Sequence, residues 1–200
     1  GTNARAWGGS SMAFGNNAKA SKGGAVAMGN GSQSRGDWGV AIGNGAKALA
    51  AGARAIGANS TADATNAAAM GWDSAASGEA SIAIGETAKA TKNNSIAMSK
   101  AAIAAADDSI AIGKNALVDT NQQRSIALGA NSKTANVVST PNQFVNGLWY
   151  KNLAGGSADS TLSVGSDTVK RTITNVAAGR MNASSTDAIN GSQLYAVANS

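Results

Sequence analysis

A five-residue phrase recurs along this chain at a fixed, short step, and that period limits the fold more than any other feature. The phrase places an alanine between two apolar positions and then closes on a glycine. It closes at Gly15, Gly29, Gly43, Gly57, Gly71, Gly85, Ser99, Gly113 and Gly129. Seven successive spacings are 14 residues, and the last is 16. A fixed short period predicts a stacked solenoid, in which residues of equal phase form columns along the stack.

Two columns of the phrase differ sharply in size. The first is alanine without exception, and the next is always large and apolar, from Phe14 and Met28 to Leu128. Side chains alternate between the two faces of an extended strand. The phrase therefore predicts a short strand with one large face and one alanine face. We expect a flattened roll with two short strands per coil, its interior filled by the large side chains against small residues three and five places after the glycine.

In that arrangement the alanine column lies on the outside of the roll. Successive coils are about 4.8 Å apart, so nine alanines form a smooth apolar wall on the order of 40 Å long. Such a wall suits an identical neighbour, because a 14-residue coil encloses little core of its own. We expect this column to form the contact between chains: Ala13, Ala27, Ala41, Ala55, Ala69, Ala83, Ala97, Ala111 and Ala127.

Two residues do not fit the columns. Arg54 stands in a column that is otherwise apolar, two positions before the large residue, and Ser99 replaces a closing glycine. A bundle of alanine-rich helices is the alternative fold, but Gly and Asn recur at fixed turn positions that would interrupt helices.

Composition argues against several function classes. The chain has no Cys and no His, so it lacks a disulfide framework and the usual ligands of zinc. Acyltransferases built on a left-handed β-helix repeat in sixes and use a catalytic histidine, which is absent here. We expect no enzyme activity, no cofactor and no metal.

The net charge of +5 favours acidic partners or an anionic surface. The clearest basic column lies four residues after the glycine and contains Lys19, Lys47, Lys89 and Lys133. It is expected to face solvent, either as a solvated face or as a ligand-facing stripe. Nucleic acid binding is disfavoured because aromatic platforms do not alternate with the charges. Trp7, Trp38 and Trp72 lie just outside the predicted core, where they either contact a ligand or plug the edges of coils.

The 14-residue step stops after Thr134. A mixed stretch then carries the only proline, Pro141, together with Phe144, Trp149 and Tyr150. A solenoid needs its last coil covered, so these aromatic residues are expected to cap the open end of the roll.

The final third carries two specific runs, K-R-T-I-T-N-V-A-A-G at 170–179 and S-T-D-A-I-N-G-S-Q-L at 185–194. Together with S-I-A-I-G at 81–85 and 109–113, they resemble the head repeats and neck of trimeric autotransporter adhesins. The resemblance implies an all-β fold of left-handed parallel β-rolls, three chains to a head, and a neck leading to a coiled-coil stalk. It divides the chain into a head at 1–134, a connector and cap at 135–169, a neck at 170–194 and the start of the stalk at 195–200.

The same resemblance assigns neck residues. Those expected to hold the crossing from head to stalk are Ile173, Asn175, Val176, Ala177, Ala178, Gly179, Thr186, Asp187, Ala188, Asn190, Gln193 and Leu194. We further expect Asp187 to pair across chains with Lys170, Arg171 or Arg180, which would tie the trimer together.

In that family the head is displayed on Gram-negative bacteria by type V secretion and contributes to virulence. The membrane contact is an outer-membrane anchor that would lie outside this chain. The resemblance implies a homotrimer that attaches to collagen, fibronectin, laminin or cell-surface receptors, and that promotes autoagglutination between cells. Repetition of identical faces would supply avidity without a deep pocket. The alternative function is a structural spacer that projects a more distal binding domain.

Overall fold

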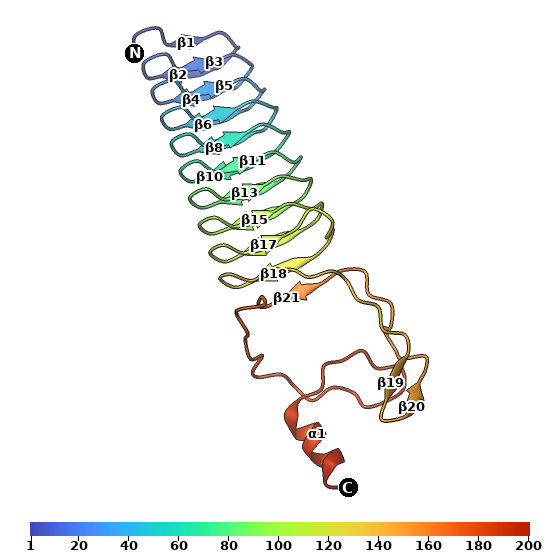
Figure 1. Ribbon diagram of the computed structural model, residues 1–200. Coiled ribbons are helices and arrows are strands. Elements are labelled where there is room, and N and C mark those ends of the chain that lie inside the picture. The colour runs from blue at the N-terminus through green and yellow to red at the C-terminus, as the bar shows by residue number, and fades with distance from the viewer. The chain divides into compact units, whose positions relative to one another are not determined.

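The computed structural model describes residues 1–200 and divides the chain into two compact units. The first unit comprises Gly1–Ala135 with Ser160–Lys170, and the second comprises Asn136–Asp159 with Arg171–Ser200. The first is a regular solenoid, in which each coil contributes one strand to each of two parallel sheets (Figure 1). The second is built from a hairpin, extended segments and one short helix.

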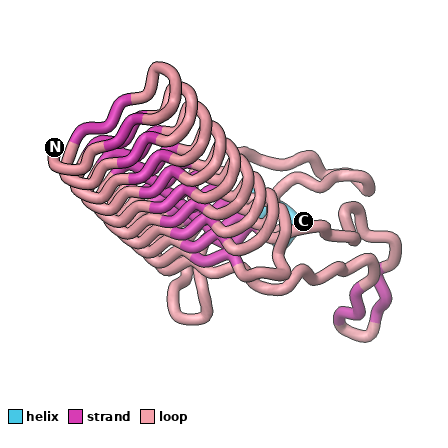
Figure 2. The backbone as a smooth tube through the Cα atoms, turned by 90° about the horizontal axis from the view of Figure 1, so that it is seen from above, coloured by secondary structure: helices cyan, strands magenta, loops and turns pink.

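Strand pairing in the solenoid follows the sequence period. Ala69 pairs with Ala55 on one side and Ala83 on the other, so each step across the sheet is one repeat of the phrase. The longer spacing between Gly113 and Gly129 does not disturb this ladder, since Ile110 still pairs with Ile126. Seen from above, the strands of one sheet stack in a row along the roll (Figure 2). The predicted parallel β-solenoid with 14-residue coils is confirmed.

The phrase itself forms the larger sheet, which has ten strands. In order these are β2 (Met12–Phe14), β4 (Val26–Met28), β6 (Val40–Ile42), β8 (Arg54–Ile56), β10 (Ala68–Met70), β12 (Ile82–Ile84), β14 (Ile96–Met98), β16 (Ile110–Ile112), β18 (Ile126–Leu128) and β21 (Leu162–Ser163).

The opposite sheet has nine strands of two residues each. In order these are β1 (Arg5–Ala6), β3 (Lys19–Ala20), β5 (Gln33–Ser34), β7 (Lys47–Ala48), β9 (Thr61–Ala62), β11 (Ala75–Ala76), β13 (Lys89–Ala90), β15 (Ile103–Ala104) and β17 (Leu117–Val118).

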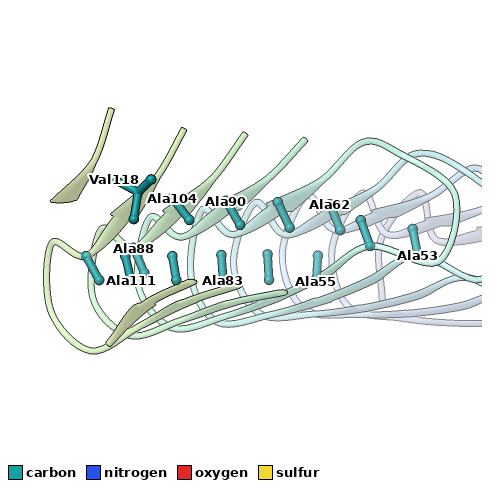
Figure 3. Packing of buried hydrophobic residues seen from close by; sticks show 14 of the residues in the cluster. Ala53, Ala55, Ala62, Ala83, Ala88, Ala90, Ala104, Ala111 and Val118 are labelled. Carbon is teal, nitrogen blue, oxygen red and sulfur yellow. The ribbon is translucent and has the colours of Figure 1, made fainter. Parts of the chain in front are cut away.

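The interior of the roll is lined by small side chains. Ala55, Ala83 and Ala111 extend inward from the ten-stranded sheet toward Ala62 and Ala90 of the other sheet (Figure 3). The expectation that the alanine column faces outward is therefore wrong, because most of it is fully buried within a single chain. The buried members are Ala27, Ala41, Ala55, Ala69, Ala83, Ala97, Ala111 and Ala127, and Ala13 near the end of the roll is half-buried.

The cause of this inversion is the short coil. Each coil must supply two strands and the turns that join them, so the two sheets lie too close for large side chains between them. A second small column, four residues before the glycine, shares the inward face and includes Ser95 and Ser109. Each of these serines donates its hydroxyl to a carbonyl three residues earlier, at 2.6 Å in both cases. Their buried oxygens are thereby satisfied.

The closing glycine is required by the stacking of coils. Gly57 has φ +131°, and a Cβ there would lie 2.5 Å from the carbonyl oxygen of Gly71 in the next coil. Ser99 occupies the same phase with φ 107°, a conformation that L residues rarely adopt. Ser99 is thus a strained position in an otherwise uniform column.

Replacing Ser99 by glycine is expected to stabilise the roll. Relief of this backbone strain is worth about 1 kcal/mol or more, which raises the melting temperature of a chain of this size by about 2–4 °C. Thermal unfolding followed by circular dichroism measures the shift. Gly85→Ser is the matched variant at the same phase and is expected to lower the melting temperature. A Ser99→Gly protein that melts below the unaltered chain would contradict the strain.

The roll ends on a strand that comes from beyond the aromatic stretch. In β21, Leu162 pairs with Ile126 of β18, and the Ile126 amide donates to the Thr161 carbonyl at 2.8 Å. The expected aromatic cap is therefore not what covers β18. Phe144 and Trp149 instead belong to the second unit, where their ring centroids lie 5.4 Å apart across a hairpin.

In the second unit this hairpin joins β19 (Gln143–Val145) to β20 (Leu148–Tyr150). Its turn residues, Asn146 and Gly147, both have positive φ, the conformation that two-residue hairpin turns require. The chain closes with α1 (Gly191–Ala198). No helix in the structure combines the length and apolar character needed to cross a membrane.

Candidate functional surfaces

The outer surface of the ten-stranded sheet carries two columns of large apolar side chains. We call it the apolar face and define it by the first and third residues of β2, β4, β6, β8, β10, β12, β14, β16 and β18. Phe14 is 71% exposed, and Met28 and Ile112 are 41% and 37% exposed. Continuous exposed apolar surface of this kind is typical of a protein interface. The large column therefore lies on the outside, opposite to the expected arrangement, and the alanine column is not available for contact between chains.

One charged side chain interrupts the apolar face. Arg54 begins β8, and its register partner in the next coil is Ala68, where the other coils have Val, Ile or Met. The long side chain thus stands beside the smallest residue of its column. Its guanidinium group makes no hydrogen bond or ion pair within the chain.

The four predicted lysines lie on the outer surface of the opposite sheet. Lys19, Lys47 and Lys89 are in β3, β7 and β13, and Lys133 forms a bridge with Leu117 of β17. Their expected outward orientation holds, since residues on either side of them, such as Ala18 and Ala20, are buried. They do not form one cluster. Lys19 and Lys47 are two coils apart, and Lys133 pairs with Asp119 at 3.3 Å.

The candidate tryptophans lie at separate places on the roll. Trp38 is 74% exposed in a turn with φ 58°, and its ring lies against the turn glycine of the preceding coil, Gly24. Trp72 is 54% exposed and directly follows the closing Gly71. Trp7 is 58% exposed beside Arg5, whose guanidinium carbon lies 5.6 Å from the ring centroid. The structure does not gather these three rings into one site.

The run at 185–194 folds back on the run at 170–179 through side-chain contacts that we call the clasp. The amide of Gln193 brackets Gly179, accepting from its N–H at 2.8 Å and donating to its carbonyl at 2.6 Å. Asn190 donates from Nδ2 to the Val176 carbonyl at 3.1 Å. Asn190 also caps α1 in a reciprocal arrangement with Gln193. These side chains hold an extended segment against the start of the helix.

Backbone geometry explains two further residues of the motif. A Cβ on Gly179 would lie 2.4 Å from the Ala188 carbonyl oxygen, so only glycine fits beneath the clasp. Asn175 has φ 61°, a left-handed conformation that asparagine tolerates. The apolar residues Ile173 and Leu194 do not contribute to a core within this chain, because they are 69% and 67% exposed.

The last clasp contact is an ion pair between Arg180 and Asp187. Two guanidinium nitrogens of Arg180 reach the two carboxylate oxygens, Nε to Oδ2 at 2.7 Å and Nη2 to Oδ1 at 2.9 Å. The Arg180 backbone N–H also donates to Oδ2 at 3.0 Å. This pairing lies within one chain. The expected contact of Asp187 across chains stays a prediction. Lys170 donates instead to the Ser166 carbonyl at 2.8 Å.

Arg180 also changes the acidity of its partner. The hydrogen bonds from its side chain, and then from its backbone, hold the pKa of Asp187 below the usual 3.8. A lowered pKa in the folded state means that the ionised pair stabilises the clasp at neutral pH. That stabilisation is lost as the pH falls through the lowered pKa.

Asp187→Asn is expected to lower the melting temperature of the chain at neutral pH but not in strong acid. The variant keeps the shape of the side chain and loses the charge that Arg180 binds. The difference from the unaltered chain should therefore shrink as the pH falls from about 6 to below about 3. Arg180→Lys keeps the charge but not the two-pronged contact, and should give an intermediate loss. A melting difference independent of pH would exclude the charge as its cause.

Comparison with known proteins adds to this geometry. A profile described as the YadA head domain repeat matches residues 1–18, 6–32, 51–74, 76–98 and 100–116. A second, described as the coiled stalk of trimeric autotransporter adhesin, matches residues 172–200. This chain belongs to the trimeric autotransporter adhesin family. Its roll is a YadA-like head, and the clasp and α1 lie in the matched stalk segment.

Three individual proteins match this chain, and the first two support the family assignment. The autotransporter adhesin BtaE of Brucella suis biovar 1 (strain 1330) is 54% identical over 68 residues, which cover 34% of this chain and 9% of BtaE. The crystal structure of the collagen-binding domain of Yersinia adhesin YadA matches with 28% identity and a TM-score of 0.59, covering 83% of this chain and 86% of that domain. The C-terminal YadA-like domain of BPSL2063 from Burkholderia pseudomallei is 44% identical, with a TM-score of 0.44 over 56% of this chain and 48% of that domain. The adhesin chain thus matches only a small part of its curated relative.

Proposed function

We propose that this chain forms the head and neck of a homotrimeric bacterial surface adhesin that attaches to host extracellular matrix, with collagen as its ligand. The observation that carries the proposal is the match of its fold to the collagen-binding domain of YadA over 83% of the chain. Membership of the family supports display at the outer membrane of a Gram-negative cell.

The apolar face is the surface we assign to the trimer contact. It is continuous over nine coils and has no partner within the chain. Full transfer of one Ile, Leu or Met side chain from water is worth about 1.5–3 kcal/mol. Side chains such as Met28 and Ile112 are already more than half covered within the chain, so an interface adds less than half of this for each of them, in nearly every coil. A second and third copy of the same chain match it in length and period. The nine-stranded sheet and the turns then remain available to a ligand.

Collagen is a repetitive rod, and a trimer of rolls offers it repeated identical surfaces. Weak contacts on three chains, and on many heads per cell, add as avidity. Fibronectin and laminin are further candidates by the same reasoning, and contacts between heads on neighbouring cells would give autoagglutination. The second function, a spacer for a more distal domain, is favoured by the constant register of the coils, which builds a regular rod.

Solid-phase binding of the purified trimer to immobilised collagen, fibronectin and laminin tests the proposal. Saturable binding to collagen that is lost on unfolding the head is the expected result. The matched control is the same chain carrying Ile84→Asp and Ile112→Asp on the apolar face, which should lose avidity together with its trimeric state. Absence of saturable binding to all three proteins would favour the spacer.

A further inference from the structure

Charge is distributed unevenly along the roll. Residues 1–60 contain six basic side chains and one carboxylate, a formal charge of +5. Residues 61–119 contain four basic side chains and seven carboxylates, a formal charge of −3. The fold stacks these segments in sequence order, so the separation in sequence is also a separation along the roll. The first four coils are a positive end and the next four a negative segment.

Most of the positive charge in the first coils lies on one face. Arg5, Lys19, Gln33 and Lys47 begin four consecutive strands of the nine-stranded sheet, and each is the register partner of the next. They form a row along the roll at the coil spacing of about 4.8 Å. Arg35 lies two residues after Gln33 and therefore on the same face, since the intervening Ser34 is fully buried.

These side chains are free to bind. The ion pairs of the roll involve Lys100 and Lys133, and none involves the basic residues of the row. The only carboxylate of residues 1–60, Asp37, lies in a turn and accepts a hydrogen bond from the Gly23 amide at 3.1 Å. The row therefore presents four positive side chains without a carboxylate partner, and the side-chain amide of Gln33, on a flat, rigid sheet.

An aromatic ring stands at the end of the row. Trp7 lies two residues after Arg5, on the same side of the strand, and the Arg5 guanidinium rests over its ring. More than half of Trp7 remains exposed. A flat aromatic ring packs well against the C–H face of a pyranose sugar, while Arg, Lys and Gln bind sulfate, carboxylate and hydroxyl groups.

From this arrangement we propose that the row formed by Arg5, Lys19, Gln33, Lys47 and Arg35, with Trp7, binds an extended anionic polysaccharide that runs along the roll. A linear polymer with regularly spaced sulfate or carboxylate groups matches a straight row of cations better than a compact acidic protein does. Nucleic acid is less well matched, because single strands are held by several aromatic platforms and this face has only one.

The proposed site would give the adhesin a second class of ligand besides matrix proteins. It rests on the proposed function in one respect. It requires the trimer contact to use the opposite, ten-stranded sheet, which leaves the row exposed on all three chains. Collagen binding and polysaccharide binding are measured separately, so failure of one is distinguishable from failure of the other. Light scattering establishes the trimeric state of every variant.

Binding of the trimer to immobilised heparin at physiological salt tests the site. The double variant Lys19→Gln, Lys47→Gln is expected to weaken binding by about tenfold or more, because contacts between several cations and a polyanion act together. The matched control is Lys89→Gln, Lys133→Gln, which removes the same charge from the same column beyond the positive end of the roll. It is expected to change heparin binding by less than about twofold.

Trp7 separates sugar recognition from simple charge attraction. Trp7→Ala is expected to weaken heparin binding without changing its dependence on salt, and Trp7→Phe to restore most of it. Equal losses in the two lysine double variants would overturn the proposal, since net charge alone would then explain binding. It is also overturned if duplex DNA or polyglutamate binds the row as tightly as heparin, or if heparin does not bind the trimer at all.

Discussion

Replacing Ala83 by leucine should lower the melting temperature of the head by on the order of 10 °C. Ala83 is fully buried between the two sheets, and its column accepts only a methyl group. Overpacking a tightly packed interior typically costs about 1–3 kcal/mol. The short turns of each coil fix the separation of the sheets here, so we expect the upper end of that range. Each kilocalorie shifts the melting temperature of a chain of this size by about 2–4 °C.

The control for this variant is the neighbouring residue on the other side of the same strand. Ile82→Leu changes the shape of a large side chain that points outward, and should leave unfolding of the roll nearly unchanged. Circular dichroism during heating compares the two. If Ala83→Leu melts like the unaltered chain, the alanine column is not the interior.

The second large effect is expected on the apolar face. Ile84→Asp combined with Ile112→Asp places six carboxylates in the proposed trimer contact, away from Arg54. Burial of a carboxylate without a partner costs several kcal/mol. Light scattering should therefore give a mass of 19.5 kDa for the variant and three times this value for the unaltered chain. A trimeric double variant would place the contact elsewhere.

Arg54→Ile is the opposite test on the same face. It replaces the one charged side chain in the apolar columns by isoleucine, which four of the nine coils carry at that position. Buried ion pairs and isolated charges are often improved upon by apolar residues of similar size. We expect a higher melting temperature for the trimer and no change in its mass. A large loss of stability would instead reveal a carboxylate partner for Arg54 on another chain.

The period made most of the fold predictable from the sequence. A constant short step can be satisfied only if each coil pairs with the next in constant register, as Ala55, Ala69 and Ala83 do. The turns were also predictable, because Gly, Asn and Asp recur where the backbone takes positive φ, as at Asn94 and Asp108. Each repeat of the sequence phrase thus corresponds to one step along the hydrogen-bond ladder of the sheet.

The direction of the side chains was not predictable from alternation alone. Alternation separates two faces but does not say which is inside, and the usual preference for large apolar residues in a core indicated the wrong one. A signal was nevertheless present. The column of Ser95 and Ser109 lies on the same side as the alanines, so both sheets offer the interior only small residues. Four small columns indicate a narrow interior and place the isoleucines outside.

The clasp illustrates a different limit. The sequence motif identified Asp187, Asn190 and Gln193 as neck residues. A single sequence does not say whether a polar pair forms within a chain or between chains. Arg180 and Asp187 are close in sequence, and the short connection between them allows the pair to close locally at 2.7 Å.

Because every coil has the same 14-residue pattern, whole coils can be added to the roll or removed from it. Deletion or duplication of one 14-residue block, such as residues 72–85, rejoins every column to its counterpart and changes the length of the roll by about 4.8 Å. An insertion of any other size must be absorbed in a turn, as the two extra residues between Gly113 and Gly129 are. The length of the roll can therefore be altered coil by coil, because each added or removed coil leaves the columns of the others in register.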